Sequence, residues 1–270
     1  MALRSRSAWR QGFLAAGVFL VCLTAASPHL ARADEGAPLA RAEQAYAQGQ
    51  YEAAAARASR HRSPAAAVLA AKALLTKALL LNEDDPQTYA LAMRALAFAD
   101  AARARNPRLV EAHLDAAIAY GLQANHLSTV DAIDKVNEAR AAIDTALALA
   151  PNDPTVLATD GAWHLMLTGR LGRIAADLLF SASREHGLEA FQRAFALSPN
   201  DPKMLYHYAK VRMMQGDADA LTEARAALNR LINMPADNVL VASFQALAPQ
   251  ATGADRWARS RGAPIMNCIR

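Results

Sequence analysis

Apolar residues recur at helical spacing along most of the 270-residue chain. Residues 108–122 place Val110, Leu114 and Ile118 on one face of a helix, and residues 136–150 repeat the pattern. Runs that alternate apolar and polar residues over the length of a strand do not occur in the sequence. The pattern therefore predicts an all-α protein.

Proline interrupts the helical patterns at regular intervals. The helix-ending prolines recur at intervals of 43, 44, 48 and 36 residues, at Pro64, Pro107, Pro151, Pro199 and Pro235. Two helical patterns lie between successive breaks, and the phrase ALALAPNDPTVL (Ala146–Leu157) returns as AFALSPNDPKML (Ala194–Leu205). Proline lacks the N–H that a helix interior needs, and the neighbouring Asn and Asp can cap the next helix. We therefore predict an α-solenoid of about four helix-turn-helix pairs, followed by a capping helix over Asn238–Ala248.

Two further stretches share the pattern of a known repeat. AYAQGQYEAAAARA (Ala45–Ala58) has a glycine at the end of one helix, an aromatic residue at the start of the next, and alanines where two helices approach. MMQGDADALTEARAAL (Met213–Leu228) has Gly216 at the same turn and no aromatic residue after it. Both stretches resemble the tetratricopeptide repeat (TPR). The resemblance implies a solenoid whose first helices line a concave face that binds partners.

The length of the units departs from the 34 residues that are usual for this repeat. The third unit carries about ten extra residues between its two helices, around Ala124–Lys135. The fourth unit carries about fourteen extra residues between Gly169 and Gly187. The sequence therefore differs most from a plain TPR scaffold in the fourth unit.

The stretched fourth unit carries a second resemblance. The segment Asp160–Asp201 resembles the repeat of the regulators of microtubule dynamics. It is also similar to exported bacterial TPR proteins, including the T component of TRAP-type solute transporters. The likeness extends over residues 41–232 and depends most on Gly161, Trp163 and the apolar insert. The likeness to the T component implies an accessory protein that binds a small ligand.

The N-terminal segment has the features of a secretory signal. Three arginines among the first ten residues precede the apolar stretch Gly12–Ala26, and Ala31–Ala33 has the small-x-small form that signal peptidase cleaves. The apolar stretch is shorter than the roughly 20 residues of a spanning helix. We predict a cleaved signal over residues 1–33, a periplasmic mature protein and no membrane span after cleavage.

Two other interpretations of the N-terminus stay open. A lipoprotein would have a small residue before Cys22, where the chain has Val21. A mitochondrial presequence would share the arginines but would be amphipathic. Beyond the signal, we expect a repeat domain over residues 34–248 and a poorly ordered tail over residues 249–270.

Removal of the signal changes the charge of the protein. The full chain has 29 basic and 25 acidic residues and a net charge of +4, but residues 1–33 hold four arginines and no acidic residue. The mature chain is therefore formally neutral, which argues against a nucleic-acid partner. Its single cysteine, Cys268, cannot form a disulfide within the chain.

The sequence contains no phosphate-binding glycine loop, zinc-ligand pair or nucleophile motif, so we expect neither a cofactor nor a metal. Asp160 and His164 lie four residues apart, before Arg170, and could form an acid–base dyad. The alternative is an ordinary pair of neighbours on one helix face.

A first candidate binding surface lies in the stretch YHYAKVRMM. On a repeat scaffold this helix would line the concave face. The candidates are Tyr206, His207, Lys210, Met213 and Met214. The alternative is that the tyrosines and methionines fill the core between repeats. The Lys/Asn carboxylate clamp of chaperone-docking TPR domains has no matching asparagines here, which disfavours capture of a C-terminal carboxylate.

A second candidate surface is the insert of the fourth unit. Leu171, Ile174 and Leu178 recur at helical spacing there, with Arg173 and Asp177 on the other face. One interpretation is a short extra helix that covers the end of the core. The other is the wall of an apolar cavity, or a patch for a partner or a second subunit.

The sequence favours a non-catalytic periplasmic adaptor that holds a protein partner, such as a component of the envelope or of a transporter. The first alternative is an accessory protein of a solute transporter that binds a small apolar ligand. A third, weaker alternative is a hydrolase-type enzyme built around Asp160 and His164.

Overall fold

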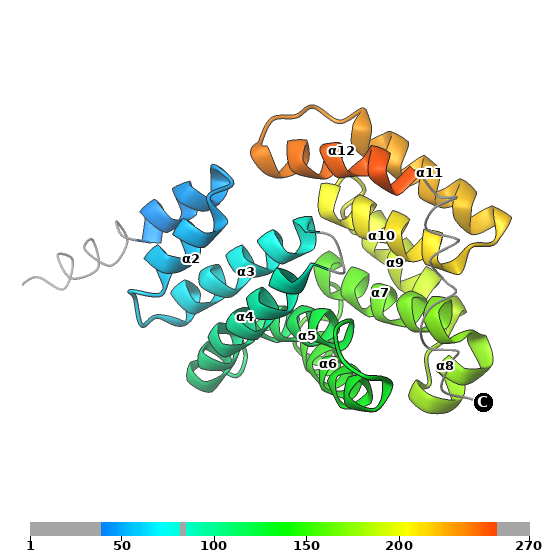
Figure 1. Cartoon of the computed structure of the whole chain (residues 1–270), viewed down its shortest axis with the longest axis horizontal. Coiled ribbons are helices and arrows are strands. Elements are labelled where there is room, and N and C mark those ends of the chain that lie inside the picture. Colours follow the sequence, from blue (N-terminus) through cyan, green and yellow to red (C-terminus); the bar gives the residue numbers. More distant parts are fainter. Residues whose placement is uncertain (1–38, 82–84, 253–270) are drawn as a thin grey trace, which may run out of the picture.

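The computed structural model describes residues 39–81 and 85–252, and these residues form helices joined by short connections (Figure 1). The predicted all-α class is confirmed within these ranges. A first short helix covers residues 39–47, followed by α2 (Tyr51–Ala58), α3 (Pro64–Leu80), α4 (Pro86–Arg105), α5 (Val110–Ala124), α6 (Thr129–Leu149), α7 (Pro154–Leu171), α8 (Arg173–Phe180), α9 (Arg184–Leu197), α10 (Pro202–Gln215), α11 (Ala218–Ile232) and α12 (Val239–Thr252). No helix in the described ranges is long and apolar enough to cross a membrane. The predicted signal segment and Cys268 lie outside these ranges.

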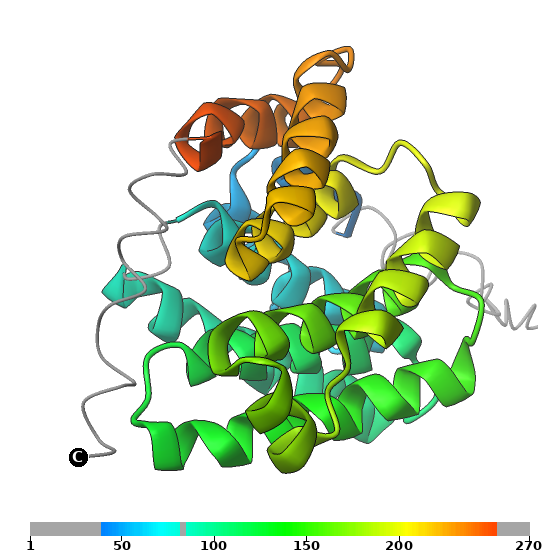
Figure 2. The same cartoon turned by 90° about the vertical axis from the view of Figure 1, so that its right-hand side faces the viewer.

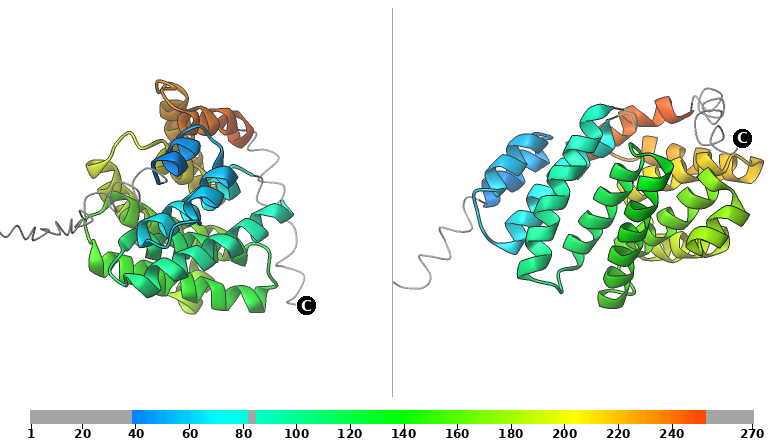
Figure 3. Two further views of the ribbon diagram at one scale, coloured as in Figure 1. Left: turned by 90° about the vertical axis from the view of Figure 1, so that its left-hand side faces the viewer. Right: turned by 60° about the horizontal axis from the view of Figure 1, so that its bottom comes forward.

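The helices pack as pairs that stack into a solenoid, as the sequence predicts. The pairs are the 39–47 helix with α2, α3 with α4, α5 with α6, α7 with α9, and α10 with α11. Because α4 also packs on α5 and α7 on α10, successive pairs lie side by side (Figure 3, right). The described residues therefore form five pairs, one more than the approximate number that the sequence predicts. The capping helix, α12, continues four residues past Ala248.

The repeated PNDP phrase begins a helix in both of its copies. Asp153 Oδ1 accepts the backbone N–H of Thr155 at 2.8 Å, and Pro154 is the first residue of α7. Asp201 and Pro202 have the same positions at the start of α10. A side-chain cap of this kind contributes about 1 kcal/mol to helix stability. The phrase therefore serves the fold, and its aspartate provides the cap that the sequence predicts.

A contact that the sequence does not predict holds both copies of this phrase in place. The guanidinium of Arg193, on α9, donates to the carbonyl oxygen of Pro151 at 3.2 Å. Arg230, on α11, donates to the carbonyl oxygen of Pro199 in the same way. In both of these pairs, α7 with α9 and α10 with α11, the second helix thus holds the turn that precedes the first helix.

The extra residues of the third and fourth units form helix. In the third unit α5 ends at Ala124 and α6 begins at Thr129, so most of the extra residues lengthen α6. The expectation that they form a connection between the two helices is therefore wrong. Their helical spacing continues that of α6, and Ser128 accepts the N–H of Asp131 as an N-cap. In the fourth unit the extra residues form α8 and its two turns.

The C-terminal helix packs against the N-terminal half of the chain. Phe244, on α12, is buried and lies with its ring centroid 5.0 Å from that of Tyr206 on α10. Leu80, at the end of α3, packs against the apolar cluster that contains Phe244 and Tyr206. Val239, at the start of α12, approaches Gly49 so closely that a Cβ there would lie 2.8 Å from Val239 Cγ1. Figure 2 shows α12 beside α11 at the top of the view. The two ends of the solenoid therefore meet.

The pair α7 and α9 crosses at two glycines. A Cβ on Gly161 would lie 2.7 Å from Phe191 Cδ2 and 2.8 Å from the carbonyl oxygen of Gly187. A Cβ on Gly187 would lie 2.8 Å from Leu165 Cγ. The two backbones thus approach to a distance at which no side chain fits. This crossing explains the importance of Gly161 in the sequence pattern.

We expect Gly161→Ala to destabilise the protein, because the added methyl group meets backbone that cannot move without separating α7 from α9. The loss in unfolding free energy should be about 1–3 kcal/mol. Gly121→Ala is the matched control, since nothing lies within 4 Å of its added methyl group. That change should stabilise α5 by about 0.5–1 kcal/mol. Urea unfolding followed by circular dichroism measures both, and an equal effect of the two substitutions would contradict the crossing.

Candidate functional site

The insert of the fourth unit forms α8, a helix of eight residues that begins directly after α7. Gly172 has a φ of +79°, and this left-handed conformation turns the chain between the two helices. Ser181 ends α8 in the left-handed region, and its N–H donates to the carbonyl oxygen of Asp177 at 2.8 Å. Two tight turns therefore separate α8 from the helices that precede and follow it.

α8 leaves most of its apolar face uncovered. Ala176 is buried, and the ring of Phe180 packs edge-on against Trp163 at 6.5 Å. Ile174 and Leu178 are 86% and 82% exposed, and Leu179 is 59% exposed. We call the surface formed by these three residues the α8 surface. The interpretation of the insert as a cover for the core is therefore wrong for these three side chains, whereas Leu171, Ala176 and Phe180 do pack against the core.

A cavity of about 1010 Å³ lies beside this surface, between the end of α7, α8 and the start of α9. Leu171, Ile174 and Leu178 line it, so the structure brings together the three residues that the sequence selects in the insert. Four charged residues also line the cavity: Arg173, Asp177, Arg184 and Glu185. Arg173 and Glu185 form an ion pair at 3.2 Å, and Arg184 pairs at 2.7 Å with Asp217, the N-cap residue of α11. The cavity thus combines an apolar wall with a charged rim.

The five candidates on α10 do not line this cavity. Tyr206 and Met214 are 7% and 5% exposed. Tyr206 packs on Phe244 of α12, and Met214 packs against the backbone of α7 at Gly169. The interpretation of these two residues as core-filling is therefore the one that the structure supports.

The other three candidates on α10 lie around Tyr206 and α12. The ring of His207 lies 6.1 Å from that of Phe244, and the ammonium group of Lys210 lies 5.9 Å from the Tyr206 ring. Met213 is half-buried and packs against the apolar cluster that contains Tyr206 and Phe244. Packing of α12 on α10 thus occupies much of the face that the sequence assigns to a partner.

Asp160 and His164 belong to a larger polar network. Asp160 is 2% exposed, and its Oδ1 accepts from the guanidinium of Arg140, on α6, at 2.7 Å. Its Oδ2 lies 2.8 Å from Nε2 of His186, on α9. The buried carboxylate thus links α6, α7 and α9. The pairing of Asp160 with His164 alone, at 3.7 Å, is the weakest of these contacts.

Hydrogen bonding assigns the tautomer of His164. The backbone N–H of Ser183 donates to His164 Nδ1 at 3.0 Å, so this nitrogen carries a lone pair and the proton of the neutral ring is on Nε2. Burial lowers the pKa of His164 to about 4, and this effect outweighs the opposing charge of Asp160. His164 is therefore neutral at pH 7, with Nδ1 occupied by a backbone donor.

Asp160, His164 and His186 bring three groups of the kind that bind metals within 4.8 Å of one another. Two contacts oppose a cation at this place. Arg140 already supplies a positive charge to Asp160, and Nε2 of His164 carries a proton. A buried network that is satisfied in this way positions helices. We therefore assign the cluster to the packing of α6, α7 and α9.

The sequence does not reveal Arg140 and His186 as partners of Asp160. They are 20 and 26 residues away from it, and an i,i+4 pattern detects neighbours on one helix only. The predicted stacking of the helices is the one signal that could have indicated these two partners. In a stacked solenoid the preceding helix and the paired helix flank each first helix, so their polar residues at matching heights can meet.

The geometry defines a TPR-like protein with stretched helical repeats, and comparison with solved structures agrees. The chain is similar to the crystal structure of a thermophilic TPR protein from Thermus thermophilus, with a TM-score of 0.59 and 20% identity. The match covers 80% of this chain and 98% of that chain. The family model of the regulator of microtubule dynamics protein 1-3 matches residues 38–247, so the chain belongs to this family. No curated protein matches the sequence. The fold is of a type that suggests a scaffold for protein interactions.

The lowered pKa of His164 predicts a loss of stability in acid. Its pKa in the folded state, about 4, lies below the ordinary value of 6.5. Between these pH values the unfolded chain binds more protons than the folded chain, so the free energy of unfolding falls as the pH falls from 6.5 to 4. The contribution of this residue should be about 2 kcal/mol at pH 5. Thermal unfolding at pH 7 and pH 5 measures it.

His164→Asn isolates this contribution, because the amide oxygen can still accept the N–H of Ser183 and the side chain cannot titrate. The melting temperature of this variant should fall less between pH 7 and pH 5 than that of the natural protein. Equal falls for the two proteins would show that His164 is not the group responsible.

Proposed function

We propose that the protein is a non-catalytic adaptor that binds a protein partner through the α8 surface and the cavity beside it. The observation that carries this proposal is the exposure of Ile174 and Leu178 on a helix that the fold holds away from the core. The turns at Gly172 and Ser181 position the helix, and the hydrogen bond from Ser181 N–H to the carbonyl oxygen of Asp177 closes its C-terminus. The exposure of its apolar face therefore follows from the fold. Exposed apolar patches with a polar rim are typical of interaction sites.

The charged rim favours a protein over a small apolar ligand. Four charged side chains line the cavity, and two of its apolar lining residues, Ile174 and Leu178, are largely exposed to solvent. A pocket for an apolar ligand would instead enclose most of the ligand within apolar walls. A partner helix or loop can bury Ile174 and Leu178 and meet the rim with charges of its own.

We also infer that the protein acts in the periplasm. The basic N-terminus, the short apolar stretch and the cleavage-like Ala31–Ala33 support this location. The mature chain would then meet components of the envelope or of a transporter, which are the partners that the sequence favours. A neutral net charge after removal of the signal fits a protein partner better than an anionic polymer.

Substitution of Ile174 and Leu178 by Asp together should abolish binding of the partner. A photo-cross-linking residue at position 179, introduced into the protein in cells, should trap an adduct of one defined mass. The double substitution should remove that adduct, because burial of a carboxylate without a partner opposes association. Circular dichroism should be unchanged, since both side chains are exposed.

Val130→Asp is the matched control. Val130 lies at the start of α6, is 76% exposed, and is remote from α8 in the sequence. This change should leave the adduct at position 179 intact. If no adduct forms at position 179, or if Val130→Asp removes it as fully as the double substitution does, the α8 surface is not the binding site.

Fractionation of cells tests the location. The processed protein should be released with the periplasmic contents, and its N-terminal residue should be near Asp34. Retention of the uncut N-terminus in the membrane would overturn the export assignment. The adaptor function could then still be tested by cross-linking, because it depends on α8 and not on the signal.

A further inference from the structure

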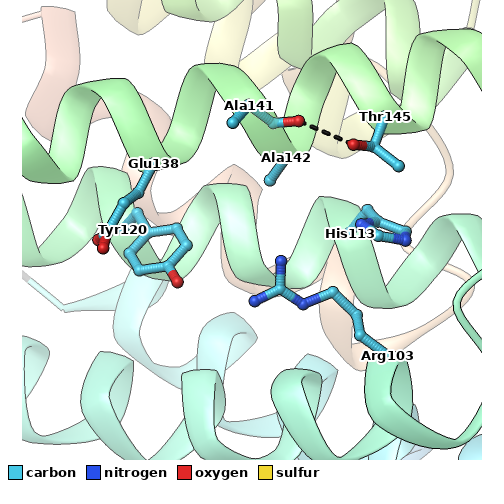
Figure 4. Close-up of a pocket in the computed structure, with 7 residues that line it drawn as sticks. All are labelled: Arg103, His113, Tyr120, Glu138, Ala141, Ala142 and Thr145. Atoms are coloured by element: carbon cyan, nitrogen blue, oxygen red, sulfur yellow. Dashed lines mark hydrogen bonds between the residues drawn. The ribbon is translucent and has the colours of Figure 1, made fainter.

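A second, smaller cavity lies far from α8 along the chain, among α4, α5 and α6. Its volume is about 240 Å³, and its lining residues are Arg103, His113, Tyr120, Glu138, Ala141, Ala142 and Thr145 (Figure 4). Polar groups from three helices thus converge on one small space. The proposed adaptor function makes no use of it.

His113 presents an unsatisfied acceptor to this cavity. The side chain is 8% exposed, and its Nε2 lies 2.8 Å from the carbonyl oxygen of Pro107. A carbonyl can only accept, so Nε2 carries the proton and Nδ1 carries a lone pair. Nδ1 is buried and has no hydrogen-bond partner among the described residues. A buried acceptor without a partner is costly, so this atom calls for a donor from outside the chain.

Arg103 presents donors to the same cavity. Its guanidinium extends from α4 into the space between Tyr120 and His113 (Figure 4). One of its terminal nitrogens pairs with Asp100, which is half-exposed on the same helix. A guanidinium has five N–H donors in a planar fork, so its hydrogen bonds with Asp100 and Tyr120 leave other donors to meet a planar anion. Burial lowers the pKa of Arg103, but its interactions with Asp100 and Tyr120 together raise the pKa by more, so the group stays charged.

The remaining polar groups limit what the ligand can be. Thr145 donates to the carbonyl oxygen of Ala141 at 2.9 Å, and Glu138 pairs with Lys135 at 2.6 Å. The methyl groups of Ala141 and Ala142 form an apolar wall. A volume of about 240 Å³ is below the usual range of pockets for drug-sized ligands. The occupant must therefore be small, with one anionic end and one hydrogen-bond donor.

We propose that this cavity binds a small carboxylate with a hydroxyl or ammonium group on the adjacent carbon. The carboxylate pairs with the guanidinium of Arg103, and the adjacent O–H or N–H donates to His113 Nδ1. Lys135 already pairs with Glu138 and lies 5.2 Å from the centroid of the Tyr120 ring, so His113 Nδ1 is the group that recognises the hydroxyl or ammonium of the ligand. The site takes 2-hydroxy and 2-amino acids of low mass, and it lies apart from the surface that binds the partner.

Calorimetric titration of the full chain with glycolate, glycine and acetate tests the assignment. Glycolate or glycine should bind saturably at concentrations up to about 10 mM. Acetate, which lacks the donor, should bind about tenfold more weakly, because His113 Nδ1 then stays unsatisfied. The stronger of the first two ligands shows whether the hydroxyl or the ammonium group is recognised. No saturable binding by any of the three would overturn the proposal, and so would equal binding of acetate and glycolate.

Two variants assign the residues. Arg103→Gln should weaken binding about tenfold or more, whereas Arg105→Gln, which changes an exposed arginine on the same helix, should leave it unchanged. His113→Phe should remove the difference in affinity between glycolate and acetate, because the acceptor that distinguishes them is absent. Circular dichroism checks that each variant is folded, and the comparison of ligands on the natural protein is decisive even if one variant is not. Equal weakening by the two arginine substitutions would contradict the site.

Discussion

The close approach of α7 and α9 at Gly161 and Gly187 determines the shape of the fourth unit. Because the two backbones touch there, α7 and α9 pack as a TPR-like pair although the chain between them is long enough to form another helix. That helix, α8, cannot enter the space between its neighbours and must turn outward. Its exposed Ile174 and Leu178 are thus a consequence of the crossing. The close packing of two glycines thus leaves an apolar surface exposed on a neighbouring helix.

The network around Asp160 supports the same crossing from the side. The carboxylate of Asp160 accepts from Arg140 on α6 and contacts His186 on α9, so three helices are tied to one buried charge. Removal of Arg140 would leave that buried charge without its cationic partner, which is more harmful than removal of an exposed ion pair. The residues that resemble a catalytic dyad in the sequence therefore stabilise the scaffold that holds α8 in position.

Much of the fold follows from local sequence signals, and most of the site does not. The PNDP phrases locate helix starts because Asp and Pro act within one turn of the chain, and the unusual spacing locates the insert. The exposure of Ile174 and the burial of Tyr206 depend on contacts between distant segments. An amphipathic pattern has the same appearance whether its apolar face meets the core, another helix or solvent. The contacts of Arg140 and His186 with Asp160 cannot be predicted from the pattern for the same reason, because they join distant segments.

The position of α12 explains why both candidate binding regions lie outside the expected one. A TPR solenoid is expected to bind on its concave face, which the first helices of the pairs form. Here Phe244 of α12 covers Tyr206 on α10, and the start of α12 reaches the turn at Gly49. A partner that used that face would have to displace a packed helix and expose the buried Phe244, at a cost of about 1.5–3 kcal/mol for that side chain alone. The α8 surface and the cavity between α4 and α6 require no such displacement, so association there retains the full free energy of the contacts formed.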